Sequence, residues 1–388
     1  MSYNLVITQN HLKESCLMNK SIHHSEIIFN KLKEINLTQQ LSYIAIKHIM
    51  TIIITIFTFG YKGKTINFEK NSDNHRTTVA HFLNEGKWNS ELLEDIIKCA
   101  VINIIYSESE KSGEPIFCMI DDTIASKTKP SSKALHPIED AYFHQSHLKG
   151  RQDYGHQAVG VMLSCNGLTL NYDIILYDKS MSKIDLVCGI ADELKAAPNV
   201  SYLLCDSWYT CSKVTEAFIK KGFYTVGALK TNRIIYPSGI GISISKLAEN
   251  IFKDDMFFRT VTVKGHKYHV FRYECNLKNI DNAVVLITYP VGAFHNKKAL
   301  RSFLCTDTNL TTEEILNIYT ERWDIEVFFR DSKSKLALDK YQIRSSKGIK
   351  RFWLISSLAY LLACFESDDF DFSEGYCILM KKIENDVV

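Results

Sequence analysis

The segment IFCMIDDT (residues 116–123) marks the start of the sheet that we expect to organise the fold. Its first five residues form a continuous apolar run, which is typical of a buried central strand. Two further strand-like runs follow, HQAVGVMLSC (156–165) and LTLNYDIILYD (168–178), and Asn166-Gly167 between them is a strong hairpin signal. Helical stretches then alternate with two more apolar strands. This succession predicts a mixed α/β sheet with helices on its faces.

Two other segments of the chain have residue patterns that differ from that of this core. Residues 1–110 repeat apolar side chains at helical spacing, which predicts a helical N-terminal region. Residues 231–300 alternate like strands, which predicts a β-rich insertion. We therefore expect the α/β core to occupy residues 111–230 and 301–350, and residues 351–388 to form a C-terminal helical segment with a possible role in dimerisation.

Composition excludes several classes of protein. The 388 residues carry 46 Lys and Arg against 44 Asp and Glu, so net charge argues neither for nor against a nucleic-acid partner. A hydrophobic content of 46% excludes a disordered or fibrous chain. The 11 cysteines include no Cys-x-x-Cys pair, which favours reduced thiols. The most apolar run, residues 49–60, is shorter than the about twenty residues of a bilayer span, so we expect a buried helix, no membrane partner and a cytoplasmic location.

Two isolated aspartates follow apolar strands. Asp121 ends the first buried run, and Asp206 ends SYLLCD (201–206). Carboxylates at the C-terminal ends of strands lie where α/β folds place their chemistry. The alternative is that both residues cap turns, as Asp often does.

A third acid lies on a long helix that we expect from about Thr312 to Leu338. Its start matches the capping-box pattern Thr-x-x-Glu. At about 100° per residue, four polar side chains fall within about 60° of one another. These are Tyr319, Arg322, Glu326 and Lys333. An ion-pair ladder on an exposed helix could produce the same stripe, but the many apolar neighbours favour a largely buried helix.

The spacing Tyr-x2-Arg-x3-Glu-x6-Lys, preceded by two strand-end aspartates, resembles the signature of cut-and-paste insertion-sequence transposases of the DDE group. HRTTVAHFLNEGKW (75–88) resembles the N-terminal helical region of related transposases, and the resemblance covers roughly residues 75–350. It implies a ribonuclease-H-like catalytic fold, a DNA-binding N-terminal region, and catalysis by Asp121, Asp206 and Glu326.

The adjacent pair Asp121-Asp122 leaves a choice for the first acid. Neighbouring residues of a strand point to opposite faces, so only one of the two can join Asp206. The family pattern, Asp followed by any residue and then Thr or Ser, favours Asp121, because Thr123 completes it. Asp122 is then a supporting or turn residue.

The resemblance implies two Mg²⁺ ions, which Mn²⁺ may replace, bound by Asp121, Asp206 and Glu326. Two such ions stabilise the attacking and leaving oxygens of a phosphodiester displacement, and carboxylates are the ligands that hard cations prefer. The expected activity is binding of transposon ends, cleavage of the DNA and joining of the 3′-OH ends to a target. The expected partners are double-stranded terminal repeats and target DNA, with a homodimer acting at the bacterial nucleoid.

DNA contacts are expected on the catalytic helix and directly after it. The resemblance implies that Tyr319, Arg322 and Lys333 contact phosphates. Residues 340–351 carry several cations and no acid, a pattern that favours phosphate binding here, although it is often only a solvated face. The cations are Lys340, Arg344, Lys347, Lys350 and Arg351.

Some alternatives remain open. A ribonuclease-H-like nuclease that only hydrolyses DNA, or an inactive DNA-binding derivative, would share these motifs. An aspartyl phosphotransferase usually shows Asp-x-Asp-x-Thr, which is absent here. Trp208 and Trp323 could stack on an unpaired base, but each flanks a catalytic acid on a core element, so core packing is favoured. Aromatic residues of the insertion, such as Phe257, Phe258 and Tyr268, are equal candidates for such stacking.

Overall fold

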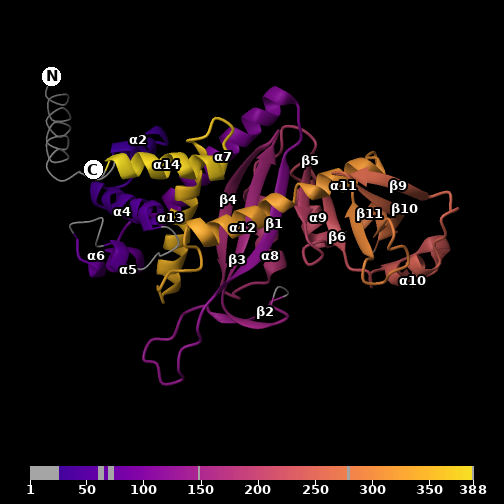
Figure 1. Cartoon of the computed structure of the whole chain (residues 1–388), viewed down its shortest axis with the longest axis horizontal. Helices are drawn as coiled ribbons and strands as arrows, with labels where there is room; N and C mark the ends of the chain where they lie inside the picture. The colour runs from indigo at the N-terminus through magenta and orange to yellow at the C-terminus, as the bar shows by residue number, and fades with distance from the viewer. Residues whose placement is uncertain (1–25, 60–64, 69–73, 147–148, 278–279, 387–388) are drawn as a thin grey trace. The chain divides into compact units, whose positions relative to one another are not determined.

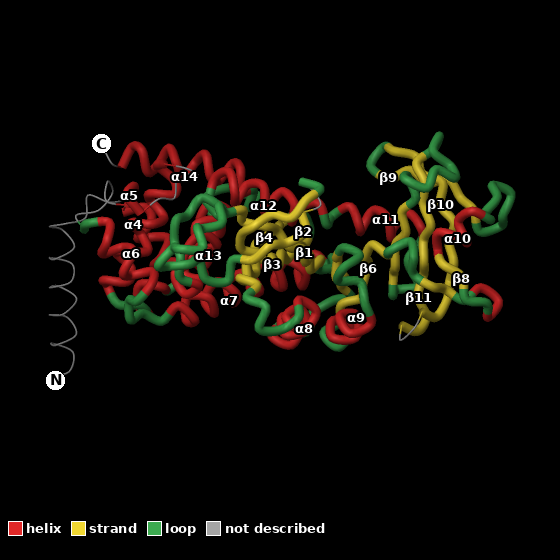
Figure 2. Tube along the Cα trace, turned by 90° about the horizontal axis from the view of Figure 1, so that it is seen from below, coloured by secondary structure: helices red, strands yellow, loops and turns green. Residues whose placement is uncertain are grey.

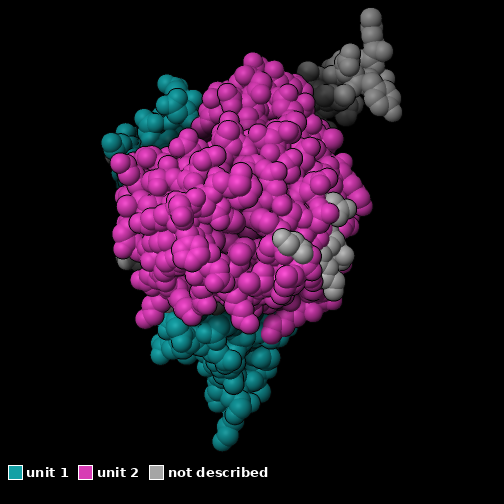
Figure 3. Space-filling model, turned by 90° about the vertical axis from the view of Figure 1, so that its right-hand side faces the viewer, with its two compact units in different colours: residues 1–100, 124–156, 330–388 teal, residues 101–123, 157–329 magenta. Residues whose placement is uncertain are grey.

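The computed structural model describes residues 26–59, 65–68, 74–146, 149–277 and 280–386 (Figure 1). The chain forms two compact units, coloured separately in Figure 3. The first unit comprises residues 1–100, 124–156 and 330–388, and the second comprises residues 101–123 and 157–329.

One mixed sheet runs through the fold. Its order is β2-β3-β1-β5-β6-β12-β11-β10-β9, with β4 paired to β3. The strands are β1 (Phe117–Ser126), β2 (Tyr142–Ser146), β3 (Arg151–Cys165), β4 (Leu168–Tyr177), β5 (Ser201–Cys205), β6 (Phe223–Leu229), β9 (Phe258–Val263), β10 (His266–Leu277), β11 (Ile280–Pro290) and β12 (Arg301–Cys305). A separate small sheet pairs β7 (Ile234–Ile235) with β8 (Ile242–Ser243).

The centre of the second unit is parallel. Strand β5 pairs in parallel with β1 on one side and with β6 on the other. All five residues of β5 are buried, as predicted for a central strand. Helices α8 (Lys183–Glu193) and α9 (Ser212–Ile219) lie on one side of the sheet and α12 (Trp323–Lys335) on the other (Figure 2). The predicted mixed α/β sheet flanked by helices is confirmed.

The predicted hairpin at Asn166-Gly167 is also confirmed. Strands β3 and β4 are antiparallel, and their last pair is Cys165 with Leu168. The turn therefore consists of Asn166 and Gly167 alone. Both have positive φ, 50° for Asn166 and 85° for Gly167. Asn and Gly tolerate this conformation better than other residues, which is why the dipeptide predicts a hairpin.

Strands β9, β10 and β11 fall within residues 231–300 and continue the same sheet. Strand β12 is antiparallel to both β6 and β11, so it joins this antiparallel part to the parallel centre. Helix α10 (Ile244–Glu249) packs against these strands, and together they form a separate hydrophobic core. That core includes Ile244, Ala248, Val285 and Ile287.

Helices make up most of the first unit. They are α2 (Glu26–Glu34), α3 (Leu37–Gln40), α4 (Tyr43–Phe59), α5 (Thr65–Phe68), α6 (Arg76–Asn84), the first part of α7 (Ser90–Ser112), α13 (Ser346–Cys364) and α14 (Phe372–Asp386). The apolar run beginning at Ile49 lies in α4 as a buried helix, as predicted, and α4 packs on α13 and α14. Its last residue, Gly60, lies outside the described residues. No helix in the described part of the chain has the length and apolar character needed to cross a membrane.

Arg351 does not have the role predicted for it. Its side chain is only 4% exposed, inside α13, and its guanidinium donates to the carbonyl oxygens of four residues at the end of α6 and just after it. These residues are Phe82, Leu83, Gly86 and Trp88. The carbonyls at a helix C-terminus have no partner within the helix, so a buried cation satisfies them. The prediction that Arg351 binds DNA is therefore wrong, because its donors are already used inside the protein.

We expect Arg351→Ala to lower the free energy of unfolding by roughly 3–4 kcal/mol, because it leaves several buried carbonyls without donors. Urea denaturation followed by circular dichroism measures the change. Lys350→Ala, at an exposed position on the same helix, is the control and should change stability by no more than about 0.5 kcal/mol. A loss below about 1 kcal/mol for Arg351→Ala would contradict this structural role.

Candidate active site

The register of the parallel strands brings two acids together. Ile120 of β1 lies opposite Cys205 of β5, so Asp121 and Asp206 occupy the next position on neighbouring strands. Strand β5 ends at Cys205, one residue before the predicted end at Asp206. Strand β1 continues to Ser126, so Asp121 does not end its strand. The two acids nevertheless lie at the same edge of the parallel centre, as the sequence predicts.

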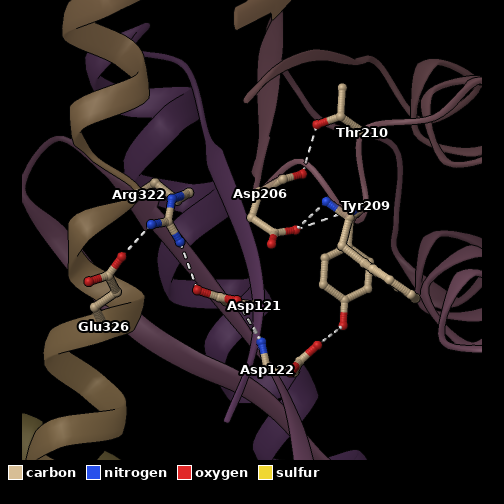
Figure 4. Close-up of polar contacts among 8 residues, drawn as sticks. Asp121, Asp122, Asp206, Tyr209, Thr210, Arg322 and Glu326 are labelled. Carbon is tan, nitrogen blue, oxygen red and sulfur yellow. Dashed lines mark hydrogen bonds and ion pairs between the residues drawn. The ribbon is translucent and has the colours of Figure 1, made fainter. Parts of the chain in front are cut away.

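Asp206 begins a tight turn. Its Oδ1 accepts hydrogen bonds from the backbone N–H of Trp208, at 2.9 Å, and of Tyr209, at 3.3 Å. Its backbone carbonyl accepts from the Thr210 hydroxyl at 2.8 Å (Figure 4). Asp206 therefore also has the turn-capping role considered as the alternative, and this role fixes the direction of its carboxylate.

Asp122 is held away from this pair by partners of its own. Its carboxylate accepts from the Tyr209 hydroxyl at 2.7 Å, from the Lys183 ammonium at 2.7 Å and from the Gln157 amide at 2.5 Å. Tyr209 is fully buried and thus links the turn after β5 to β1. Sequence reasoning missed Tyr209, Lys183 and Gln157, because no spacing relates three residues on different elements to Asp122.

The expected long helix is in fact two helices. α11 (Thr312–Thr320) ends before Glu321, and α12 begins at Trp323. The predicted capping box at its start is confirmed, with reciprocal hydrogen bonds between Thr311 and Glu314. The expectation of one continuous helix is wrong, and Arg322 lies in the turn between the two.

Arg322 bridges two of the predicted catalytic acids. Its guanidinium donates to Asp121 Oδ2 at 2.7 Å and to Glu326 Oε1 (Figure 4). Its side chain is 15% exposed, and although burial lowers its pKa, Tyr319, Asp121 and Glu326 raise it above the ordinary value, so Arg322 stays charged. Asp121, Arg322 and Glu326 thus form one partly buried charge cluster.

Burial also perturbs Asp121. It raises the pKa of that carboxyl to about 6, and the neighbouring Asp206 and Asp122 carboxylates act in the same direction. Arg322 and the Asp122 backbone N–H oppose this shift. Carboxylates whose charge is costly in this way attract a compensating cation.

The resemblance implies divalent cations bound by these acids. Among the described residues, no group of three or more His, Cys, Asp or Glu side chains is arranged to hold a metal ion. Asp121, Asp206 and Glu326 nevertheless supply the oxygen donors that Mg²⁺ and Mn²⁺ prefer. The cation beside Asp121 and Glu326 in this structure is the Arg322 guanidinium. The residues therefore fit a hard cation chemically.

Tyr319 lies against the sheet at the end of α11. Its ring packs on Phe303 of β12, with centroids 4.7 Å apart, and the Arg322 guanidinium lies 5.8 Å from its ring centroid. Burial raises the pKa of Tyr319 to about 12, so the phenol keeps its proton. This side chain therefore orients Arg322 as well as carrying a hydroxyl.

The other predicted phosphate contacts fall in the first unit. Lys333 is partly buried in the last turns of α12, and burial lowers its pKa. Lys340 is exposed and pairs with Asp339 at 3.4 Å, and Arg344 donates to the His136 carbonyl. Lys347 and Lys350 are exposed near the start of α13. These five cations, without Arg351, remain candidates for DNA contacts.

Two tryptophans are placed differently from the prediction. Trp208 is 54% exposed and Trp323 is 58% exposed, so neither packs in the core. Trp208 lies in the turn after β5, and Trp323 is the first residue of α12. Both indoles are therefore available to a ligand of the second unit.

Comparison with known proteins adds one finding. Residues 112–362 match a family model described as "Transposase DDE domain". The matched segment contains Asp121, Asp206 and Glu326. The search of curated proteins finds no match to this chain.

Proposed function

Because this chain belongs to the transposase DDE domain family, we propose that it cleaves DNA at the ends of a mobile element and joins the released 3′-OH ends to target DNA. The observation that carries the proposal is the pairing of Asp121 and Glu326 with Arg322 in the second unit, with Asp206 at the position after Cys205, which lies opposite Ile120. Such a cluster combines three acids with a cation at one edge of a parallel sheet, where α/β folds bind substrates.

Asp121, Asp206 and Glu326 would hold the divalent cations, Mg²⁺ or Mn²⁺, in this mechanism. When bound, these ions stabilise the charge that builds on the attacking and leaving oxygens of the phosphodiester. Asp206 is already oriented by the N–H groups of Trp208 and Tyr209. Asp121 and Glu326 are paired with Arg322. A divalent cation would compete with Arg322 for these carboxylates, and the phosphates of DNA would compete with the carboxylates for Arg322.

Arg322 then has a second partner available. A guanidinium released from two carboxylates can bind a phosphate oxygen with the same fork of N–H donors. The phosphates of DNA bring negative charge to a site that already has three acids, so a cation positioned here reduces the repulsion. Tyr319, which packs beside Arg322, limits how far the guanidinium moves.

The proposed partner is double-stranded DNA, as terminal inverted repeats and as target. We propose further that two copies of the chain pair the two ends. In this proposal, the N-terminal region of residues 1–110 supplies sequence-independent phosphate contacts, and so do the exposed cations Lys340, Arg344, Lys347 and Lys350.

A cleavage and strand-transfer assay with the element's own end DNA and Mg²⁺ tests the function. Cleavage at the ends followed by joining to a target plasmid is the expected result. Cleavage without joining would favour a ribonuclease-H-like nuclease, and end binding without cleavage would favour an inactive DNA-binding derivative.

Arg322 and Lys333 are expected to bind phosphates. Replacing either with Ala should weaken binding to end DNA and lower the log–log salt slope by roughly 0.9 for each lost contact. Binding of labelled end DNA, measured at several salt concentrations, gives the slope. Lys220→Ala, at an exposed position on the C-cap of α9, is the control and should leave the slope unchanged. An unchanged slope with a lower melting temperature would assign Arg322 a structural role only.

A further inference from the structure

A pocket of about 350 Å³ in the second unit has an acidic wall. Helix α9, strand β6, the first residues of β11 and the loop after β12 contribute to this wall. Glu216 and Asp307 line it, and the described residues of the wall include no Lys, Arg or His. The pocket is separate from the cluster of Asp121, Arg322 and Glu326, none of which lines it. Its charge favours a positively charged ligand.

Asp307 is the more buried of the two acids, with only 6% of its surface exposed. Its carboxylate accepts from the Tyr202 hydroxyl at 2.9 Å and from the backbone N–H of Asn309 at 3.1 Å. These two bonds leave about half of the acceptor positions of a carboxylate. Arg272 reaches the same loop, but its guanidinium donates to backbone carbonyls and to Glu274. A cation that brings hydrogen-bond donors would therefore stabilise the buried Asp307 carboxylate.

A buried hydroxyl without a partner lines the same pocket. Thr215, on α9, is 6% exposed, and its Oγ1 forms no hydrogen bond with any described residue. A helical Thr often donates to the carbonyl four residues before it, as Thr51 and Thr55 do in α4. Buried polar groups are almost always hydrogen-bonded, so an exception that lines a pocket points to a ligand.

The size of the pocket and the apolar part of its wall favour an organic cation over a metal ion. Pockets for small molecules have volumes of about 300–1,000 Å³, whereas a water occupies only about 30 Å³. Ile219, Tyr224 and Ile280 contribute apolar surface to the wall. The methylene groups of an aliphatic amine can cover such surface while its charged ends stay on polar groups, which a metal ion cannot do. Two acids in one pocket favour a ligand with two ammonium groups.

We propose that this pocket binds a linear aliphatic diamine or polyamine. One ammonium group donates to Asp307 and to Thr215 Oγ1, and a second pairs with Glu216, which is exposed. The methylene chain between them contacts Ile219 and Ile280. An ammonium group has only donors, so it suits a wall of carboxylates, hydroxyls and amide oxygens. This site goes beyond the proposed function, because none of the predicted catalytic acids takes part in it.

Isothermal titration calorimetry of the full-length protein with spermidine, in metal-free buffer without DNA, tests the site. Binding at a single site per chain is the expected result. Asp307→Asn should weaken binding by at least about tenfold, because it removes a charge-assisted hydrogen bond. Glu216→Gln should weaken it by about two- to fivefold, as expected for an exposed ion pair. Thr215→Val, which keeps the shape of the side chain, should weaken it by about two- to tenfold.

Asp192→Asn and Thr225→Val are the matched controls. Asp192 is an exposed acid of the same unit that does not line the pocket. Thr225 Oγ1 is buried and, like Thr215 Oγ1, has no hydrogen-bond partner among the described residues, but Thr225 does not line the pocket either. Both variants should bind spermidine within about twofold of the unaltered protein. Because Glu216 is exposed, Glu216→Gln stays informative if Asp307→Asn does not fold.

Two other cations separate a diamine from the alternatives. N-acetyllysine methylamide carries a single ammonium group and should bind about two- to fivefold more weakly than spermidine. Calcium chloride should not compete with spermidine at equal concentration. Equal or tighter binding of either cation, lost in Asp307→Asn, would overturn the proposal of a diamine.

The proposal is also overturned if spermidine does not bind, or if Asp307→Asn and Glu216→Gln both leave its binding within about twofold of the unaltered protein. The titration contains no DNA, so its outcome is independent of cleavage. A protein that binds spermidine in this pocket but fails to cut end DNA would refute the proposed function and leave the diamine site standing.

Discussion

Asp121→Asn is expected to abolish DNA cleavage, by at least about 10³-fold, while Asp122→Asn keeps measurable activity. Asn retains the shape of Asp but removes the charge that a divalent cation and Arg322 require. The Asp121 carboxylate lies 2.7 Å from Arg322, and Arg322 also contacts Glu326. Loss of the Asp121 charge therefore breaks the cluster that carries the proposed chemistry.

Asp122 should behave differently because its carboxylate oxygens already accept hydrogen bonds within the protein. Tyr209, Lys183 and Gln157 all donate to it, so Asp122→Asn should cost about 1–3 kcal/mol of stability and lower the melting temperature. Cleavage of end DNA with Mg²⁺, measured together with thermal unfolding, separates the two residues. If Asp122→Asn is inactive and Asp121→Asn active, the first acid is Asp122.

Glu326→Gln is expected to reduce cleavage by at least about 10³-fold and to leave binding of end DNA largely intact. Gln keeps the length of the side chain and can still accept a hydrogen bond from Arg322. It lacks the negative charge that a divalent cation needs, and it leaves Arg322 paired only with Asp121. Single-turnover cleavage and end binding, measured on the same preparation, test both parts.

Glu321→Gln is a matched control for Glu326→Gln. Both glutamate side chains are 37% exposed and both form one ion pair, Glu321 with Lys264 and Glu326 with Arg322. Glu321 lies at the end of α11 and contacts none of the three predicted acids in the described interactions, so its replacement should keep cleavage within about twofold. Cleavage by Glu326→Gln within tenfold of the unaltered protein would exclude Glu326 as a catalytic residue.

Sequence patterns predict the structure of this protein well where that structure depends on neighbouring residues. The apolar runs, the Asn166-Gly167 turn and the Thr311 capping box depend on neighbouring residues, and each is found where the sequence predicts it. A turn divides the expected helix, but Tyr319, Arg322 and Glu326 still lie close together, because residues three or four apart remain neighbours on either side of the turn. This explains why the family could be inferred from the sequence before any contact was known.

The errors concern residues whose environment depends on distant partners. In the sequence Arg351 is one more cation in a basic run, but its guanidinium donates to carbonyls between 263 and 269 residues away, those of Trp88 and Phe82 among them. Trp208 and Trp323 are predicted to be core residues because each flanks a predicted catalytic acid on a core element. More than half of the surface of each residue is nevertheless exposed. Burial is a property of what packs against a side chain, and sequence neighbours do not report it.

The sequence by itself determined most of the strands and helices, the two aspartates that follow apolar runs and the spacing of the signature, because hydrophobic period and turn chemistry act over a few residues. Only the tertiary structure decided which aspartate meets Arg322. Asp121 and Arg322 are 201 residues apart, and Asp122 and Tyr209 are 87 apart, so their pairing follows from the parallel register of β1 and β5 and from the turn before α12. The direction of a side chain on a strand alternates with each residue, and the elements packed on each face decide whether that direction leads to a cation, a hydroxyl or solvent.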